Sequence, residues 1–429
     1  MKKFFSLIII VFANINFSYS QNVSTVAGTG LAGSTNGSGA VASFNHPYGV
    51  ALDSEGNIYV ADTQNNKIRK ITADGHVSTY AGSGVSGSNN GPALSASFNS
   101  PYGVVVDAEG NLYVTDSGNN KIRKIDPSGM VTTFAGSGAP GTEDGEGILA
   151  TFNHPYGIAI DLSGNIYVTD YSGDKIRKIT PAGTVTTFAG SGEQGSVNGE
   201  GNIASFNRPA GLAVDNFGNV YVADQVNQKV RKITSLGYVS TLAGNGNTGN
   251  NDGDAESASF AWPTGIGLDA LGNVYVGDGT HKVRKISPSG VVSTFVGNGA
   301  YGNTDGPASF AQFKMAVSFA TDATGNIFVA DLYNHSIRKI TPAITDLSSD
   351  SDDPFFNVFP VPVKDNLTIC YQGSDFEVDI YNGKGSKVYS AFLNSGYCNI
   401  PFESMADGLY LVVLKIQGKV IEQRTITKK

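Results

Sequence analysis

Short apolar runs recur along the chain with polar turns between them. In the first copy, residues 50–53 form an apolar run, and residues 58–61 alternate β-branched and aromatic side chains. Two more runs follow at residues 67–71 and 77–81, after turns rich in glycine, asparagine and aspartate. Runs of this length with such turns predict an antiparallel meander of four strands. No part of the repeats shows a helical period over ten or more residues, so the pattern predicts an all-β fold.

The four-run unit occurs six times. The aspartates that close the first run are 53 or 54 residues apart, and they are Asp53, Asp107, Asp161, Asp215, Asp269 and Asp322. One four-stranded sheet cannot bury both of its faces, so neighbouring units must stack on each other. Radial stacking of such sheets gives a β-propeller.

The motif PYGVALDSEGNIYVADTQNNKIRKI, residues 47–71, resembles an NHL repeat. The resemblance covers roughly residues 22–345 and implies a six-bladed propeller, for which we assign residues 21–345. Residues 23–28, VSTVAG, match the fourth run of the other units, while the sixth unit has no fourth run of its own. We therefore expect the N-terminal strand to complete the last blade, which also removes two exposed sheet edges.

The N-terminus has the pattern of a secretory signal peptide. Lys2 and Lys3 precede an apolar core, and small residues at 18 and 20 predict cleavage before Gln21, so residues 1–20 leave the mature chain. The alternative, a membrane anchor, is disfavoured because the apolar run is too short. No other stretch approaches the ~18 apolar residues of a transmembrane helix.

The C-terminus has a different pattern. Residues 346–354 are rich in serine and aspartate and predict a linker, and the alternation over residues 355–429 predicts a small β-sandwich. This segment resembles the C-terminal sorting domain of the type IX secretion system of Bacteroidetes. Its matching residues are Pro360, Pro362, Tyr381, Gly385, Asp407, Gly408, Leu409 and Tyr410. The resemblance implies the type IX machinery as a partner and a secreted or surface location.

Both cysteines of the chain, Cys370 and Cys398, lie in this C-terminal segment. In an exported protein they could form a disulfide, or they could be two buried free thiols in a sandwich core. The sequence leaves both readings open.

Composition narrows the classes of partner. The formal net charge of −8 disfavours nonspecific binding to nucleic acid or to anionic membranes. The 54 glycines, together with 40% hydrophobic residues, fit a turn-dense β protein rather than a disordered one. We expect a monomer without a transmembrane segment and without a nucleic-acid partner.

Comparing the six units separates scaffold from site. Asp62 and Arg69 recur in every unit, which predicts that the aspartate caps loop amides or pairs with the arginine. Asn57 also recurs, at a turn where we expect left-handed backbone. The Lys-Ile-Arg-Lys run occurs once per unit, which favours buried stems and regular ion pairs over a nucleic-acid surface.

The positions that vary where the others are fixed are the candidate site. One column holds His46, Ser100, His154, Arg208, Trp262 and Met315, and a second holds Tyr48, Tyr102, Tyr156, Ala210, Thr264 and Val317. A third column follows the second strand and holds Thr63, Ser117, Tyr171, Gln225, Gly279 and Leu332. These columns are expected at one mouth of the channel, as a ring. The candidate ligand-binding residues are His46, Tyr48, Tyr102, His154, Tyr156, Tyr171, Arg208 and Trp262.

Three functions remain open. The first is a binding module for an extracellular peptide, glycan or protein, and the second is a passive scaffold for surface display. The third is a metal-dependent enzyme, because the NHL resemblance extends to lyases with a three-histidine zinc site and to lactonase-like propellers with calcium. Only His46 and His154 occupy equivalent positions, so no catalytic residue and no metal site is assigned. Acidic loops at 142–146 and 250–256 leave calcium as an alternative, although the EF-hand spacing is absent. We expect no other cofactor.

Overall fold

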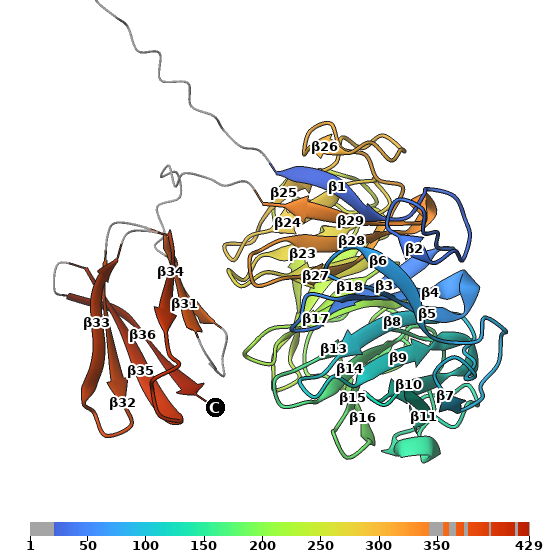
Figure 1. Cartoon of the computed structure of the whole chain (residues 1–429), viewed down its shortest axis with the longest axis horizontal. Coiled ribbons are helices and arrows are strands. Elements are labelled where there is room, and N and C mark those ends of the chain that lie inside the picture. Colours follow the sequence, from blue (N-terminus) through green and yellow to red (C-terminus); the bar gives the residue numbers. More distant parts are fainter. Residues whose placement is uncertain are drawn as a thin grey trace, which may run out of the picture.

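The computed structural model describes residues 21–342, 355–359, 366–372, 376–393, 396–416 and 419–428 (Figure 1). The expected signal peptide and linker lie outside the described residues. The described part consists of strands and a few single-turn 3₁₀ segments, which confirms the all-β prediction.

The first sheet shows the plan of every blade. From the inside outward it contains β3 (Pro47–Leu52), β4 (Ile58–Asp62), β5 (Lys67–Ile71) and β6 (His76–Ala81), each antiparallel to the next. The plan recurs in five more sheets. Their strands are β8 (Pro101–Val106), β9 (Leu112–Asp116), β10 (Lys121–Ile125), β11 (Met130–Ala135), β13 (Pro155–Ile160), β14 (Ile166–Asp170), β15 (Lys175–Ile179), β16 (Thr184–Ala189), β17 (Pro209–Val214), β18 (Val220–Asp224), β19 (Lys229–Ile233), β20 (Val239–Ala243), β22 (Gly265–Leu268), β23 (Val274–Gly277), β24 (Val283–Ile286), β25 (Val291–Val296), β27 (Ala316–Thr321), β28 (Ile327–Asp331) and β29 (Ser336–Thr341). We number these blades 1 to 6 in chain order.

The inner strands form a closed ring. Each contacts the inner strand of the next blade, and β27 of blade 6 contacts β3 of blade 1. The outer strand of blade 6 is β1 (Asn22–Ala27), which pairs with β29 so that Val23 lies opposite Ile340. The short strand β26 (Gly306–Pro307) then pairs with β1, as β2 (Gly37–Ser38) pairs with β6 in blade 1. The N-terminal strand therefore completes the last blade, as predicted.

A buried arginine holds the outer half of each blade together. In blade 1, Arg69 is fully buried, and its Nη1 lies 2.8 Å from Oδ2 of Asp62. Its Nη2 donates to Oδ1 of Asn36 at 2.7 Å, and its guanidinium lies 5.3 Å from the ring centre of Phe44. The other oxygen of Asp62 accepts the backbone N–H of Asn45 at 2.7 Å. Both predicted roles of the aspartate are thus present, and the buried charge is paired as burial requires.

One local prediction was wrong. The left-handed residue of the first turn is Gly56, with φ at 80°, and not Asn57. The backbone N–H of Asn57 and its side-chain Nδ2 instead donate to the two carboxylate oxygens of Asp53, at 2.9 and 2.8 Å. Asparagine recurs here because its side chain can donate while glycine takes the strained φ.

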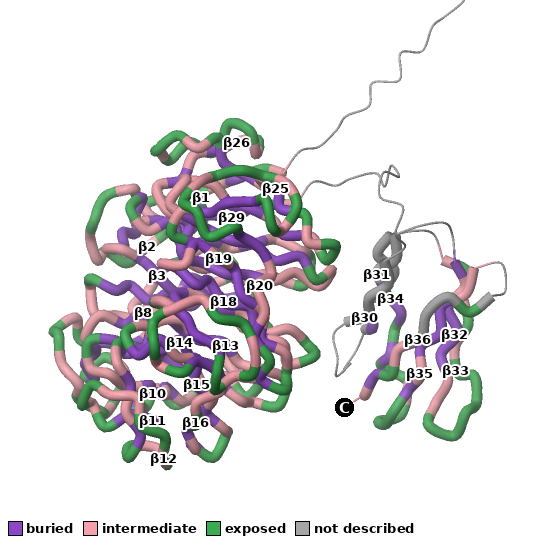
Figure 2. The backbone as a smooth tube through the Cα atoms, turned by 180° about the vertical axis from the view of Figure 1, so that it is seen from behind, coloured by how far each residue is buried: buried purple, intermediate pink, exposed green. Residues whose placement is uncertain are grey.

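The C-terminal segment has two sheets. One contains β30 (Phe355–Phe359), β31 (Asn366–Gln372) and β34 (Gly396–Pro401), and the other contains β33 (Lys387–Leu393), β32 (Phe376–Asn382), β35 (Gly408–Ile416) and β36 (Lys419–Lys428). Buried residues from both sheets form one core, visible in Figure 2 as the buried positions of this segment. The predicted small β-sandwich is confirmed. The side chains of Cys370 and Cys398 lie outside the description, so the structure does not decide between a disulfide and two free thiols.

Candidate functional site

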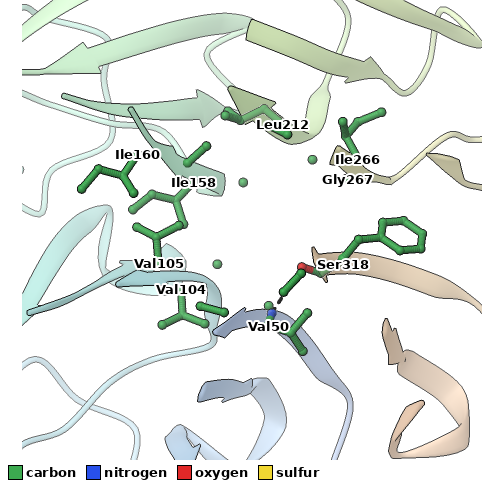
Figure 3. A pocket seen from close by; sticks show the side chains of 18 of the residues that line it. Val50, Val104, Val105, Ile158, Ile160, Leu212, Ile266, Gly267 and Ser318 are labelled. Carbon is green, nitrogen blue, oxygen red and sulfur yellow. Dashed lines mark hydrogen bonds between the residues drawn. The ribbon is translucent and has the colours of Figure 1, made fainter. Parts of the chain in front are cut away.

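A channel runs along the propeller axis between the inner strands. It encloses about 370 Å³ and is lined mainly by aliphatic side chains and glycine backbone. Val50, Val104, Ile158, Leu212 and Ile266 line it from five different blades (Figure 3). Blade 6 contributes Ser318, whose hydroxyl oxygen accepts the backbone N–H of Val50 at 3.2 Å.

Three tyrosines close one end of this channel. The Tyr48 ring lies 4.9 Å from the ring of Tyr102 and 4.9 Å from that of Tyr156, although Tyr156 belongs to a blade two positions away. Tyr102 and Tyr156 stack at 4.2 Å. The rings therefore meet near the axis, with only 5% of Tyr48 exposed. Burial raises the pKa of all three phenols, so they are neutral near pH 7.

This packing corrects the expected open funnel. The positions equivalent to these tyrosines in blades 4 to 6 hold the smaller residues Ala210, Thr264 and Val317, all buried. Large residues in one half of the ring fill the space that small residues leave in the other half. The tyrosine column is the floor of the loop face and not an open ring.

A polar chain extends from the floor across blades 3 to 5. Tyr171 stacks on Tyr156 at 4.8 Å, and its hydroxyl donates to Oε1 of Gln225 at 2.9 Å. Nε2 of Gln225 donates to the hydroxyl of Thr264 at 3.0 Å, which in turn donates to the carbonyl of Trp262 at 2.9 Å. These bonds fix the positions of Tyr171 and of the Trp262 backbone.

Exposed side chains stand at the rim of the loop face. His154, Arg208 and Trp262 are exposed, with 48% of the Trp262 surface accessible. The Arg208 guanidinium lies 5.9 Å from the ring centre of Tyr171. The rim of the loop face therefore carries an exposed indole in blade 5 and, in blade 4, a guanidinium near the ring of Tyr171.

The rim residues share an unusual backbone conformation. His46, Ser100, His154, Arg208 and Trp262 all have φ between 51° and 55°. Left-handed backbone costs a residue with a Cβ about 1–2 kcal/mol, so something must hold it. In each case a side chain of the preceding blade accepts the rim N–H. The acceptors are Asn66 Oδ1 for Ser100 (2.9 Å), Asn120 Oδ1 for His154 (2.9 Å), Asp174 Oδ1 for Arg208 (2.7 Å), Gln228 Oε1 for Trp262 (2.6 Å) and His335 Nδ1 for His46 (3.1 Å).

His46 differs from the other rim residues because the side chain that accepts its N–H is itself a histidine, His335. Its ring lies 4.8 Å from that of His335 and 5.5 Å from that of Tyr333, and it is half-buried. Burial, and secondarily the charges of His46 and Lys314, lower the pKa of His335. The sequence predicted His46 as a site residue, and the structure places it in the contact between blades 1 and 6.

The seam between blades 5 and 6 departs from the pattern. Nδ1 of His281, which corresponds to the acceptors above, has no hydrogen-bond partner within the described residues. The N–H of Met315 donates instead to Asp331, and Met315 does not have a positive φ. In blade 5 the loop after β23 is one residue shorter than in the other blades. Nη1 of Arg284 lies 3.8 Å from Oδ2 of Asp278, farther than in the equivalent pairs of the other blades. These departures from the repeat thus involve blade 5, which also carries Trp262, and its seam with blade 6.

Sequence reasoning missed this column of acceptors. Its members, Asn66, Asn120, Asp174, Gln228, His281 and His335, vary between units in the same way as the rim residues do. Every residue of this column has a side chain that can accept a hydrogen bond, and this shared property could have indicated the role from the sequence.

Among residues 21–342 and the described parts of the C-terminal segment, no three His, Cys, Asp or Glu side chains gather in a metal-binding group. Two of the loop carboxylates that suggested calcium, Asp144 and Asp252, bind the buried arginines Arg177 and Arg284 at 2.8 and 2.5 Å.

Comparison with known families finds NHL repeats at residues 44–71, 98–125 and 206–233. Residues 357–428 match the secretion system C-terminal sorting domain. Both predicted resemblances are confirmed. The sorting domain indicates secretion and surface localisation by the type IX machinery. No helix within the described residues is long and apolar enough to cross a membrane.

Among curated relatives, chicken NHL repeat-containing protein 2 is 29% identical over 365 residues, which cover 75% of this chain and 50% of that protein. The Arabidopsis thaliana protein SUPPRESSOR OF QUENCHING 1, chloroplastic, is 28% identical over 323 residues, covering 70% of this chain and 31% of that protein. The chain thus spans half or less of the length of these relatives.

Solved structures share the fold. A protein of unknown function from Bacteroides thetaiotaomicron has a TM-score of 0.59 at 22% identity, covering 75% of this chain and 76% of that one. An auxiliary nutrient binding protein from Bacteroides ovatus has a TM-score of 0.57 at 18% identity, covering 76% and 77%. Their source is consistent with the expected Bacteroidetes type.

Proposed function

We propose that this secreted NHL-repeat propeller is a binding protein whose loop face takes an extracellular peptide, glycan or protein. The observation that carries the proposal is the exposed indole of Trp262, held in a left-handed backbone by Gln228 and Thr264. Because the backbone that carries this large exposed group is already fixed, only the side chain loses conformational entropy when a ligand covers it.

The neighbouring groups extend the proposed surface. Arg208 offers guanidinium donors for a carboxylate, sulfate or carbonyl oxygen, and Tyr171 offers a ring face that is itself fixed by Gln225. His154 adds a side chain that can donate or accept at the same rim. Tryptophan and arginine are the residue types that most often dominate binding energy in recognition surfaces. The fold shared with an auxiliary nutrient binding protein supports oligosaccharides and peptides derived from nutrients as the first ligands to test.

The test uses the fact that Trp262 is the single tryptophan of the chain. Its fluorescence reports directly on the proposed surface when the mature protein is titrated with members of an oligosaccharide and peptide library. A ligand that binds there shifts or quenches the emission, and Arg208→Ala and Trp262→Ala each weaken its binding by at least ~2 kcal/mol, roughly 30-fold. Phe310→Ala is the matched control, since Phe310 is also exposed but lies in the outer loop of blade 6.

Calorimetry measures the Trp262→Ala variant, which has no indole emission. The contradicting result is a ligand that binds the parent protein without changing the Trp262 emission and binds Arg208→Ala and Trp262→Ala as tightly as the parent. That result would place the binding site elsewhere.

A further inference from the structure

Large apolar residues gather on the face opposite the loop face, at the hairpin turns of blade 4. Phe217 stands at the turn between β17 and β18, and Leu236 and Tyr238 stand at the turn between β19 and β20. Their exposed fractions are 66%, 95% and 52%. These three residues form what we call the blade 4 apolar tip.

The internal repeat shows that the fold does not require this tip. At the places of Phe217 and Leu236 the other blades carry polar, small or half-buried residues, whereas at the place of Tyr238 blades 2 and 5 also carry apolar residues. For Phe217 these are Glu55, Glu109, Ser163, Leu271 and Thr324, and for Leu236 they are Asp74, Ser128, Ala182 and Ser289. Blade 4 thus has a large exposed apolar residue in each of its two hairpin turns, although the same turns form in other blades without one. Exposed apolar residues that the fold does not need indicate a contact outside the blade.

The two turns present one surface. A Cβ added to Gly218 in the first turn would lie 3.3 Å from Cβ of Ser235 in the second. The N–H of Phe217 donates to Oδ1 of Asp215 at 2.9 Å, and the N–H of Gly237 donates to the carbonyl of Thr234 at 2.8 Å. The tips are therefore adjacent and rigid. Leu162, 60% exposed at the equivalent turn of blade 3, extends the apolar surface toward the neighbouring blade.

The structure shows which part of the chain reaches this surface. The guanidinium carbon of Arg424, on β36 of the sorting domain, lies 5.8 Å from the ring centre of Phe217. The sorting domain lies beside the propeller in Figure 1. A guanidinium over an aromatic face is attractive because the ring face carries negative charge density.

We propose that the blade 4 apolar tip is the docking surface for the chain's own sorting domain, with Arg424 on Phe217 as its centre. The contact places the sorting domain beside the hairpin face, while Phe217 and Leu236 remain mostly exposed. The loop face, at the other end of the channel, remains open. This inference is independent of the proposed ligand site.

Photo-crosslinking in the intact mature chain tests the docking. Leu236 is replaced by p-benzoylphenylalanine, and in a matched control the same probe replaces Ser128, the equivalent exposed residue of blade 2. Docking gives intrachain crosslinks from position 236 to peptides of residues 419–428, several-fold above the yield from position 128. Equal yields from both positions, or crosslinks only between separate chains, overturn the proposal.

Two further variants identify the contact. Phe217→Ser and Arg424→Gln each reduce the intrachain yield from position 236 several-fold, whereas Met130→Ser, a partly exposed apolar residue of the equivalent blade 2 turn, leaves it unchanged. Circular dichroism and the thermal midpoint show that each variant is folded. Folded Phe217→Ser and Arg424→Gln proteins with unchanged yields contradict the proposed centre.

Discussion

The backbone amide of Trp262 donates a hydrogen bond to the side-chain Oε1 of Gln228, 2.6 Å away and in the preceding blade. The bond joins two residues that both have left-handed backbone, with φ at 51° and 56°. The bond fixes the backbone that carries the exposed indole to the preceding blade. Equivalent bonds in four other seams make this a ring of contacts between blades.

The strain of this position predicts an unusual order of stabilities. Glycine adopts a positive φ without a Cβ clash, so Trp262→Gly should be more stable to urea than Trp262→Ala by ~1 kcal/mol. Met315, the equivalent residue without a positive φ, is the control. There the alanine variant should be the more stable one, by ~0.5–1 kcal/mol, because glycine loses more entropy on folding. The same order at both positions would contradict the role of the left-handed backbone.

The contact between His46 and His335 predicts a dependence of stability on pH. Nδ1 of His335 accepts the N–H of His46 at 3.1 Å, and a proton on that nitrogen removes the acceptor. The pKa of His335 is lowered in the folded protein, so the unfolded chain takes up the proton first as the pH falls. This contribution to stability is complete above about pH 6.5 and is lost as the pH falls through the lower folded pKa.

His335→Gln is the variant that tests this, because Gln228, at the equivalent position, accepts the equivalent bond from the next blade. Urea denaturation between pH 5 and 8 should show a shallower loss of stability on the acid side for the variant than for the parent chain. His76→Gln is the control, since His76 is exposed on β6 and accepts no such bond. Identical pH profiles for the parent and His335→Gln would rule out this contact as the source.

Asp305 connects the two ends of the propeller. Its carboxylate accepts the N–H of Thr25 at 3.0 Å and the Thr25 hydroxyl at 3.2 Å, and it pairs with Arg338 at 2.7 Å. Asp305→Ala removes an acceptor of the buried Arg338 as well as the Thr25 bonds, and it should lower the free energy of unfolding by about 1–3 kcal/mol. Asn36→Ala removes the equivalent acceptor of Arg69 in blade 1, away from the chain end, and should cost less. Asn36 also accepts the hydroxyl of Thr79 at 3.4 Å, so an equal loss in both variants would show that the bonds at the chain end matter no more than the equivalent bonds within a blade.

The hydroxyl of Tyr48 is buried and has no hydrogen-bond partner among the described residues. Replacing it with hydrogen removes a desolvated polar group, so Tyr48→Phe should be neutral or stabilising by up to ~1 kcal/mol. Tyr171→Phe is the contrast, because it removes the 2.9 Å bond to Gln225 and should be destabilising by ~1 kcal/mol. Chemical denaturation of the two variants measures both. A destabilised Tyr48→Phe protein would mean that its hydroxyl has a partner, and the neighbouring hydroxyl of Tyr156 is the first candidate.

The architecture follows from the repeat pattern of the sequence. A repeat of 53 or 54 residues with four short apolar runs requires stacked four-stranded sheets, because one such sheet leaves apolar surface exposed. The displaced VSTVAG run predicted that β1 would close the ring, since an unpaired edge strand is unfavourable. The recurrence of Asp62 with Arg69 predicted a pair, because a charge that every blade buries needs a partner.

The contacts of the variable residues, in contrast, depend on packing between blades. Tyr48, Tyr102 and Tyr156 stand at the same place in three units, and nothing local shows that their rings meet across the axis, since that depends on the small residues of the opposite blades. His46 joins His335 because ring closure brings together residues 289 positions apart. Trp262 and Arg208 are exposed in a left-handed backbone that an acceptor from the preceding blade holds. Packing across the ring is a property of six blades together, and so no single repeat encodes it.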